Sequence, residues 1–170
     1  MIEGQQERPS VTADGRVIVE LIDGVQLRPA PTIVQPEEEV CEIYSLSWGV
    51  TEHPVVHVYQ TLVRPGRIKG WAYHKRQIDR IFLQSGALRF VLYDMRPESP
   101  SFGRINDICL SERNRGLLVI PCNVAHAVEN IGEGHAVFIN LPTEPYRHDD
   151  PDKYVLPLDT PEIPFRFSRR

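Results

Sequence analysis

The segment GRIKGWAYHKRQIDRIFLQSG, residues 66–86, decides the fold. It begins and ends with glycine, and it holds two runs rich in branched and aromatic residues, 69–74 and 79–84. Short runs of this kind, separated by polar and turn-forming residues, predict two consecutive β-strands. The whole segment is too short and too irregular in its apolar spacing for an amphipathic helix.

The same segment places a titratable side chain on one face of the first strand. Side chains alternate across a strand, so Ala72 and His74 share one face and Tyr73 points the other way. In a small barrel that shared face is the lumen. Asp79 opens the next strand, where its carboxylate can orient His74 and raise the pKa of its imidazole. The segment therefore predicts a histidine and a carboxylate that meet inside a barrel.

Strand-like runs continue through the middle of the chain, with joints rich in Gly, Pro, Asn and Ser between them. The expected strands are 17–22, 41–48, 55–63, 69–74, 79–84, 87–95, 105–111, 116–121, 125–131 and 135–142. About ten short strands at this spacing predict a closed antiparallel barrel or a jelly roll. Prolines gather near the two ends. We expect an N-terminal arm or edge strand at 1–35, a β-barrel at 36–145 and a C-terminal tail at 146–170 that packs on the barrel.

Composition limits the class of protein. The chain has 170 residues, 41% hydrophobic and 25% charged, with a formal net charge of -4, as in one ordinary globular domain. The acidic balance disfavours nucleic acid or an anionic membrane as the main partner. No run approaches the roughly 18 apolar residues of a membrane span, and the first thirty residues lack a secretory signal pattern. The three widely spaced cysteines predict free thiols in a reducing cytoplasm.

A second segment, IPCNVAHAVEN at 120–130, supplies another histidine, His126. Together the two segments resemble the paired motifs of the cupin superfamily, with Ala72 in place of the first histidine and Asp79 in place of glutamate. Asn123 stands where the second motif has glycine, and asparagine tolerates the left-handed backbone of a turn. The resemblance implies an all-β cupin jelly-roll (double-stranded β-helix) barrel. Metal-binding cupins use four ligands here; this chain keeps three, so no metal is expected, and any ion would be held by His74, Asp79 and His126.

A closer resemblance covers residues 40–167. The stretches GRIKGWAYH (66–74), VLYDMRPESPSFGR (91–104), VIPCNVAHAV (119–128) and LDTPEIPF (158–165) are similar to motifs of the dTDP-4-dehydrorhamnose 3,5-epimerase family. The resemblance implies a homodimer that acts on a nucleotide-linked 4-keto-6-deoxy sugar without a cofactor. Such a reaction needs a base that removes a proton beside the ketone and an acid that returns one to the opposite face.

The chain departs from this family at both proton-transfer positions. The family's catalytic histidine aligns with Ala72, and its tyrosine aligns with Asn140; neither side chain can titrate. The family's phosphate-facing arginine is Lys69, which keeps the charge without the bidentate fork. His74 could have taken over as the base. We expect catalytic roles for His74, Asp79, His126 and Asp159, and substrate binding by Lys69, Arg67, Lys75, Asn140 and Tyr146.

Three functions remain open at this point. The first is a cytoplasmic nucleotide-sugar epimerase or isomerase in deoxysugar or surface polysaccharide biosynthesis, acting at one carbon rather than two with a relocated histidine base. The second is a cupin that binds a sugar nucleotide or another small ligand without catalysis. The third is a metal-dependent cupin enzyme. Fold alone does not choose among them.

Overall fold

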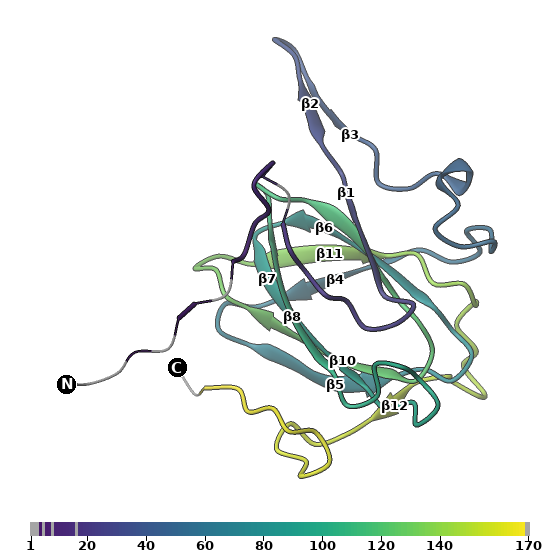
Figure 1. Ribbon diagram of the computed structural model, residues 1–170. Helices are drawn as coiled ribbons and strands as arrows, with labels where there is room; N and C mark the ends of the chain where they lie inside the picture. Colours follow the sequence, from purple (N-terminus) through teal and green to yellow (C-terminus); the bar gives the residue numbers. More distant parts are fainter. Residues whose placement is uncertain (1–3, 5, 8, 16, 169–170) are drawn as a thin grey trace.

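The computed structural model describes residues 4, 6–7, 9–15 and 17–168, and it contains two five-stranded antiparallel sheets that pack face to face (Figure 1). The first sheet has the order β1 (Gln26–Pro29), β9 (Gly116–Ile120), β6 (Asp79–Ser85), β11 (Ala136–Asn140) and β4 (Tyr59–Val63). The second has the order β12 (Tyr154–Val155), β5 (Ile68–Tyr73), β10 (Val124–Asn130), β7 (Ala87–Asp94) and β8 (Ile105–Ser111). This confirms the predicted all-β jelly roll.

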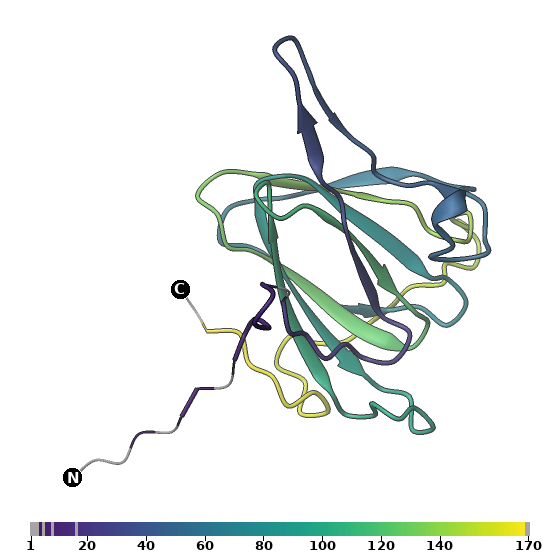
Figure 2. The same ribbon diagram turned by 45° about the horizontal axis from the view of Figure 1, so that its top comes forward.

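Two smaller elements lie outside the barrel sheets. The hairpin of β2 (Thr32–Val34) and β3 (Glu39–Cys41) projects from the body, as Figures 1 and 2 both show. A single turn of 3-10 helix, Leu46–Trp48, follows it. No helix in the described part of the chain has the length and apolar character needed to cross a membrane.

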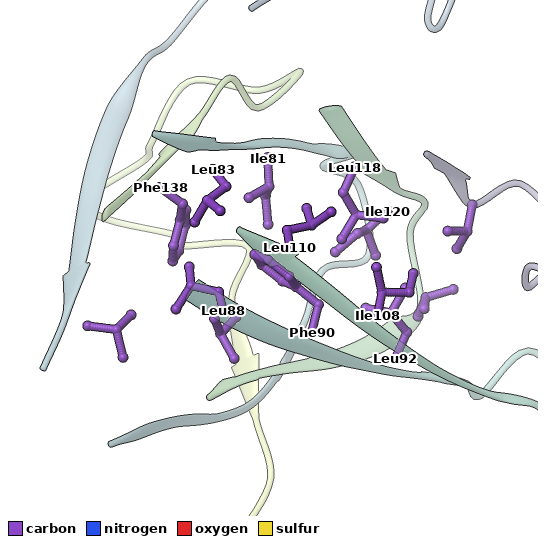
Figure 3. Packing of buried hydrophobic residues seen from close by; sticks show 14 of the residues in the cluster. Ile81, Leu83, Leu88, Phe90, Leu92, Ile108, Leu110, Leu118, Ile120 and Phe138 are labelled. Atoms are coloured by element: carbon purple, nitrogen blue, oxygen red, sulfur yellow. The ribbon is translucent and has the colours of Figure 1, made fainter. Parts of the chain in front are cut away.

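The core fills the space between the sheets. Alternate residues of each strand point inward, so one face of each sheet is apolar. Figure 3 shows this cluster, with Ile81, Leu83, Leu118, Ile120 and Phe138 from the first sheet opposite Leu88, Phe90, Leu92, Ile108 and Leu110 from the second. A tight joint at Gly86 connects β6 to β7: its φ is +84°, and a Cβ there would lie 2.7 Å from the Cβ of Ala136. The glycine that ends segment 66–86 is thus required by the backbone.

The C-terminal tail covers the outer face of the second sheet. Trp71 is buried there against Ile163, and its ring makes an edge contact with Phe165 and a tilted contact with Phe167. Tyr73 lies on the same outer side and stacks on Tyr154 at 5.1 Å between ring centroids. The alternation along β5 is therefore as predicted, because Ala72 faces the interior while its two neighbours face the tail.

Segment 91–104 connects the end of β7 to the N-terminal part of the chain through hydrogen bonds around a buried carboxylate. The Asp94 carboxylate is fully buried and accepts hydrogen bonds from Arg96, Ser99 and Ser101. Burial would raise the pKa of Asp94, but these donors, Arg96 first among them, hold it well below its usual range. Arg96 also donates to the carbonyl of Asp23, which fixes the N-terminal segment to this loop.

Three strand expectations were wrong in their bounds. The run 17–22 forms no strand: within its described residues only Val17 makes an isolated bridge, to Val11, and Val17 is 75% exposed. Of 41–48, only Cys41 belongs to a strand. In 55–63 the strand begins at Tyr59, because its partner β11 ends at the paired residue Asn140.

The first 35 residues, where we expected an arm or an edge strand, contain two strands whose bounds no sequence pattern indicated. β1 and β2 lie within proline-flanked QLRPAPTIV, residues 26–34, and β1 pairs with β9 at the edge of the first sheet. Proline at the end of an edge strand is tolerated because its missing N–H faces away from the ladder. We propose that the N-terminal arm is in part an edge strand of the barrel.

Candidate active site

A buried group of three titratable side chains lies at one end of the barrel. His74 follows β5, Asp79 opens β6, and His126 lies in β10, where it pairs with Ala72. The Asp79 Oδ2 atom is 3.4 Å from His74 Nε2 and 3.5 Å from His126 Nε2. The two imidazole rings stack with centroids 5.7 Å apart. The structure thus brings together three of the four residues expected to be catalytic, in what we call the His–Asp–His centre.

Local structure holds this centre in place. Asn123 has a φ of +59°, the left-handed conformation expected for it, and its N–H donates to the carbonyl of His74. The Asp152 carboxylate accepts hydrogen bonds from the backbone N–H groups of residues 75, 76 and 77, and so caps the turn between β5 and β6. The carbonyl oxygen of Asp152 is also the partner of His74 Nδ1. The tail therefore orients the imidazole of His74.

The charges of the centre differ from residue to residue. Burial alone would raise the pKa of Asp79, but the hydrogen bond from His74 and the two nearby imidazoles bring it well below its usual range. Burial likewise acts to lower the pKa of His74, and the contact with Asp79 outweighs it, so that pKa is raised. Burial dominates at His126 and lowers its pKa to about 4. At neutral pH the centre therefore holds an ionised carboxylate and an unprotonated His126, beside an imidazole with enhanced affinity for a proton.

The small side chain of Ala72 leaves a cavity beside the centre. This inner cavity has a volume of about 40 Å³, enough for a water molecule or one substituent of a ligand. Its lining comprises Tyr59, Lys69, Ala72, His74, Asp79, Ile81, His126, Val128, Phe138, Asn140 and Lys153.

A second, larger cavity of about 380 Å³ lies next to it. Its lining comprises His57, Tyr59, Thr61, Lys69, His74, Arg76, Gln77, Glu144, Pro145, Tyr146, Arg147, Asp150, Asp152 and Lys153. Tyr59, Lys69, His74 and Lys153 line both cavities, so the two adjoin at these side chains. A volume of this size suits a small-molecule ligand.

Positive charge gathers where the cavities meet. Among the described residues, the ammonium groups of Lys69 and Lys153 have no carboxylate within ion-pair distance, whereas Arg76 and Arg147 both approach Asp150. Burial, followed by the charge of Lys153, lowers the pKa of Lys69. Two unpaired ammonium groups at one junction favour an anionic ligand.

The His–Asp–His centre also has the donor set of a metal site. Its three ligand atoms lie within 4.8 Å of one another, and histidine and carboxylate suit several divalent ions. The same cavity is lined by Lys69 and Lys153, whose charges oppose a cation. The three ligand atoms could thus hold a metal cation, whereas the charges of the two lysines favour an anionic ligand.

The other expected site residues divide into two groups. Lys69, Asn140 and Tyr146 line one or both cavities. Arg67 and Lys75 are exposed and line neither; the Lys75 ammonium instead lies 4.3 Å from the centroid of the Tyr154 ring.

The structure does not bring Asp159 to the centre. It is exposed in the turn after Leu158, and it lines neither cavity. The indole N–H of Trp71 donates to the carbonyl of Leu158, whose side chain packs directly against Gly70. These contacts hold the segment on the outer face of β5, away from the centre. The carboxylate that contacts His74 is Asp79.

Several lining residues were not expected from the sequence, and three of them, in β4 and just before it, carried a signal. His57, Tyr59 and Thr61 are polar or amphipathic residues at every second position. All three line the larger cavity, as alternation along one strand face requires. Asp152 and Lys153 carried no such signal because they lie in an irregular tail.

Comparisons with known proteins agree with this architecture. The family model described as dTDP-4-dehydrorhamnose 3,5-epimerase matches residues 42–167. The probable low-salt glycan biosynthesis epimerase Agl13 of Haloferax volcanii is 28% identical over 139 residues, which cover 81% of this chain and 89% of that protein. The spore coat polysaccharide biosynthesis protein SpsL of Bacillus subtilis is 36% identical over 104 residues, covering 61% of this chain and 69% of that one.

A solved structure gives the same result for the fold. The dTDP sugar isomerase of Desulfovibrio desulfuricans superposes with a TM-score of 0.78 at 28% identity, and the match covers 85% of this chain and 90% of the other.

Proposed function

Because the chain belongs to the dTDP-4-dehydrorhamnose 3,5-epimerase family, we propose that it epimerises or isomerises a nucleotide-linked 4-keto-6-deoxyhexose next to the ketone. One observation carries the proposal: a ligand-sized cavity with unpaired cations adjoins a smaller one that ends at a buried His–Asp–His centre. The groups suited to bind an anion and the groups suited to transfer a proton, both of which this reaction needs, therefore lie next to each other.

The cavities suit the two parts of such a substrate. The larger cavity can take the nucleotide, with its diphosphate beside Lys69 and Lys153. The sugar then reaches the inner cavity, where Ala72 leaves room for a ring substituent. Lys69 lines both spaces, so its ammonium group can also stabilise negative charge that develops on a ketone oxygen in the inner cavity.

The His–Asp–His centre is the proposed base. Removal of a proton beside the ketone needs an acceptor at neutral pH, and neither Ala72 nor Asn140 can serve. The centre offers an unprotonated His126 and, at His74, an imidazole with raised proton affinity, both in contact with the ionised Asp79. A proton that arrives there is stabilised by the buried carboxylate.

Solvent isotope exchange tests this function. With dTDP-4-keto-6-deoxyglucose in D₂O, we expect the protein to introduce deuterium at C3 or C5, and mass spectrometry with proton NMR identifies the position. The His74→Ala and His126→Ala variants should lose this exchange. Absence of deuterium incorporation by wild-type protein at high concentration contradicts the proposal.

A non-catalytic sugar-nucleotide binder is the second candidate. It is favoured by one specific observation, that both proton-transfer positions of the family are filled by residues that cannot titrate, Ala72 and Asn140. The same incubation distinguishes the two, since a binder shows calorimetric binding of the dTDP-sugar with no deuterium incorporation.

We infer that the cellular role is surface polysaccharide synthesis in the cytoplasm. The support is in the relatives, one named for glycan biosynthesis and the other for spore coat polysaccharide biosynthesis. Nucleotide-linked sugars are the activated donors from which such polymers are built.

We propose a homodimer as the working state. The outer strand β4 is an unpaired edge of the first sheet, and the chain around it exposes Val58 and Leu62 by 54% and 52%. The hairpin β2–β3 adds Ile33 and Val34, exposed by 57% and 69%. Exposed apolar surface beside an unpaired strand edge favours association, and a second copy of the chain can bury it. Sedimentation at micromolar concentration should give twice the chain mass of 19.5 kDa; a monomer there contradicts it.

A further inference from the structure

Tyr59 lies beside Asn140, the residue that aligns with the family's tyrosine. Strand β4 lies beside β11, and Tyr59 pairs directly with Asn140 in their register. The Asn140 Nδ2 atom donates a hydrogen bond of 2.9 Å to the Tyr59 hydroxyl. Tyr59 lines both cavities. A phenol from the neighbouring strand thus stands beside the amide that replaces a phenol in this chain.

The amide of Asn140 fixes the direction of this hydroxyl. Asn140 Nδ2 donates both to Tyr59 and, at 2.8 Å, to Asp79 Oδ1, while Asn140 Oδ1 accepts from the backbone N–H of Arg80. Every polar atom of the buried amide is therefore in use, and the amide cannot flip without losing these bonds. Because the hydroxyl oxygen accepts from Asn140, its own hydrogen is left for another acceptor. None of the described side chains or carbonyls takes it, so it is available to a ligand.

The hydroxyl and the imidazoles stand on opposite walls. Tyr59 belongs to the first sheet, whereas His126 belongs to the second and His74 directly follows its strand β5; all three line the inner cavity. Burial first, and then the charge of Asp79, raise the pKa of Tyr59. The phenol therefore stays protonated at neutral pH, so its hydroxyl carries a hydrogen.

We propose that Tyr59 is the proton donor on the face of the sugar opposite the His–Asp–His centre. This rests on the proposed function. The centre takes the proton from the carbon beside the ketone, and the C–H electron pair forms the enolate. The enolate carbon then bonds to the hydroxyl proton of Tyr59 from the other face, which restores the ketone. The phenolate left behind accepts the Asn140 hydrogen bond and regains a proton from solvent through the larger cavity, while the centre releases its proton to solvent.

The Tyr59→Phe variant tests this assignment, because it removes one oxygen and keeps the ring. We expect wild-type protein in D₂O to form the epimer and to introduce deuterium together. In the variant, epimer formation should fall by about 100-fold or more. Deuterium incorporation with retained configuration should persist, since the centre can return a deuteron to the face from which it took the proton.

The control is Tyr93→Phe, which removes a hydroxyl from the outer aromatic cluster and should leave both rates unchanged. Calorimetric binding of dTDP and the thermal midpoint should match wild type in both variants, so that lost binding or folding is detected. Wild-type epimerisation by Tyr59→Phe overturns the assignment. Equal loss of exchange and epimer formation also overturns it, because a donor affects only the second step. If wild-type protein gives neither exchange nor epimer, the proposed function itself fails, and the assignment with it.

Discussion

Replacing Arg80 with methionine should destabilise the protein by about 4 kcal/mol or more, a large share of the stability of an ordinary domain. Arg80 is fully buried, yet no carboxylate accompanies it within the described residues. Its guanidinium instead donates to four carbonyls and two hydroxyls. The acceptors are the carbonyls of Leu141, Pro142, His53 and Pro54 and the hydroxyls of Tyr44 and Thr51.

These six bonds tie the irregular segment 44–54 to the end of β11. Methionine fills a similar volume but leaves four carbonyls without a donor, and each buried unsatisfied group costs about 1–3 kcal/mol. Urea denaturation should therefore show a much lower midpoint for Arg80→Met.

Two further variants separate charge from geometry. Arg80→Lys keeps the positive charge but lacks the planar fork, so its stability should fall between those of wild type and Arg80→Met. Arg113→Met, at an exposed turn, should stay within about 0.5 kcal/mol of wild type. If Arg80→Met proves as stable as Arg113→Met, the guanidinium does not hold these segments together.

Replacing Asp79 with asparagine should lower solvent isotope exchange by at least about 100-fold with little change in shape. The carboxylate is the shared partner of His74 and His126, and it also accepts from Gln77 and Asn140. The amide removes the negative charge that raises the proton affinity of His74 and stabilises a proton on the centre.

The variant has a second readout besides isotope exchange. The pKa of His74, followed by NMR titration of its imidazole, should fall when the charge of Asp79 is removed. The matched control is Asp107→Asn, which removes a surface carboxylate that pairs with Arg89 and should leave exchange unchanged. Wild-type exchange by Asp79→Asn would show that the base lies elsewhere.

The parts of this architecture that follow from strand alternation could be predicted from the sequence. Ala72, His74 and Tyr73 fall on the faces that a period of two dictates. His126 and Asp79 were expected beside His74, because each lies next to a turn that returns its strand to the same end of the barrel. Short-range periodicity is sufficient wherever both neighbours are regular strands.

The remaining features depend on contacts that no local pattern encodes. Val17 and its neighbours have high β-propensity, but no described strand pairs with them beyond one bridge, so tertiary context overrides propensity. Asp159 was expected in the centre from motif similarity alone. In the structure the packing of Leu158 on Gly70 holds this segment on the outer face of β5, away from the centre. Tyr59 was missed because its role depends on its pairing with Asn140, 81 residues away.

Because the tail docks on β5, the orientation of His74 depends on residues that are synthesised after the larger strands of the barrel. All strands of the two sheets except the two-residue edge strand β12 end by residue 140, but the carbonyl that contacts His74 Nδ1 belongs to Asp152, next to β12. The larger strands can therefore pair with one another before the His74 imidazole gains this contact. The contact that orients His74 thus depends on residues that follow the large strands in the chain, so the centre is completed only when the tail docks.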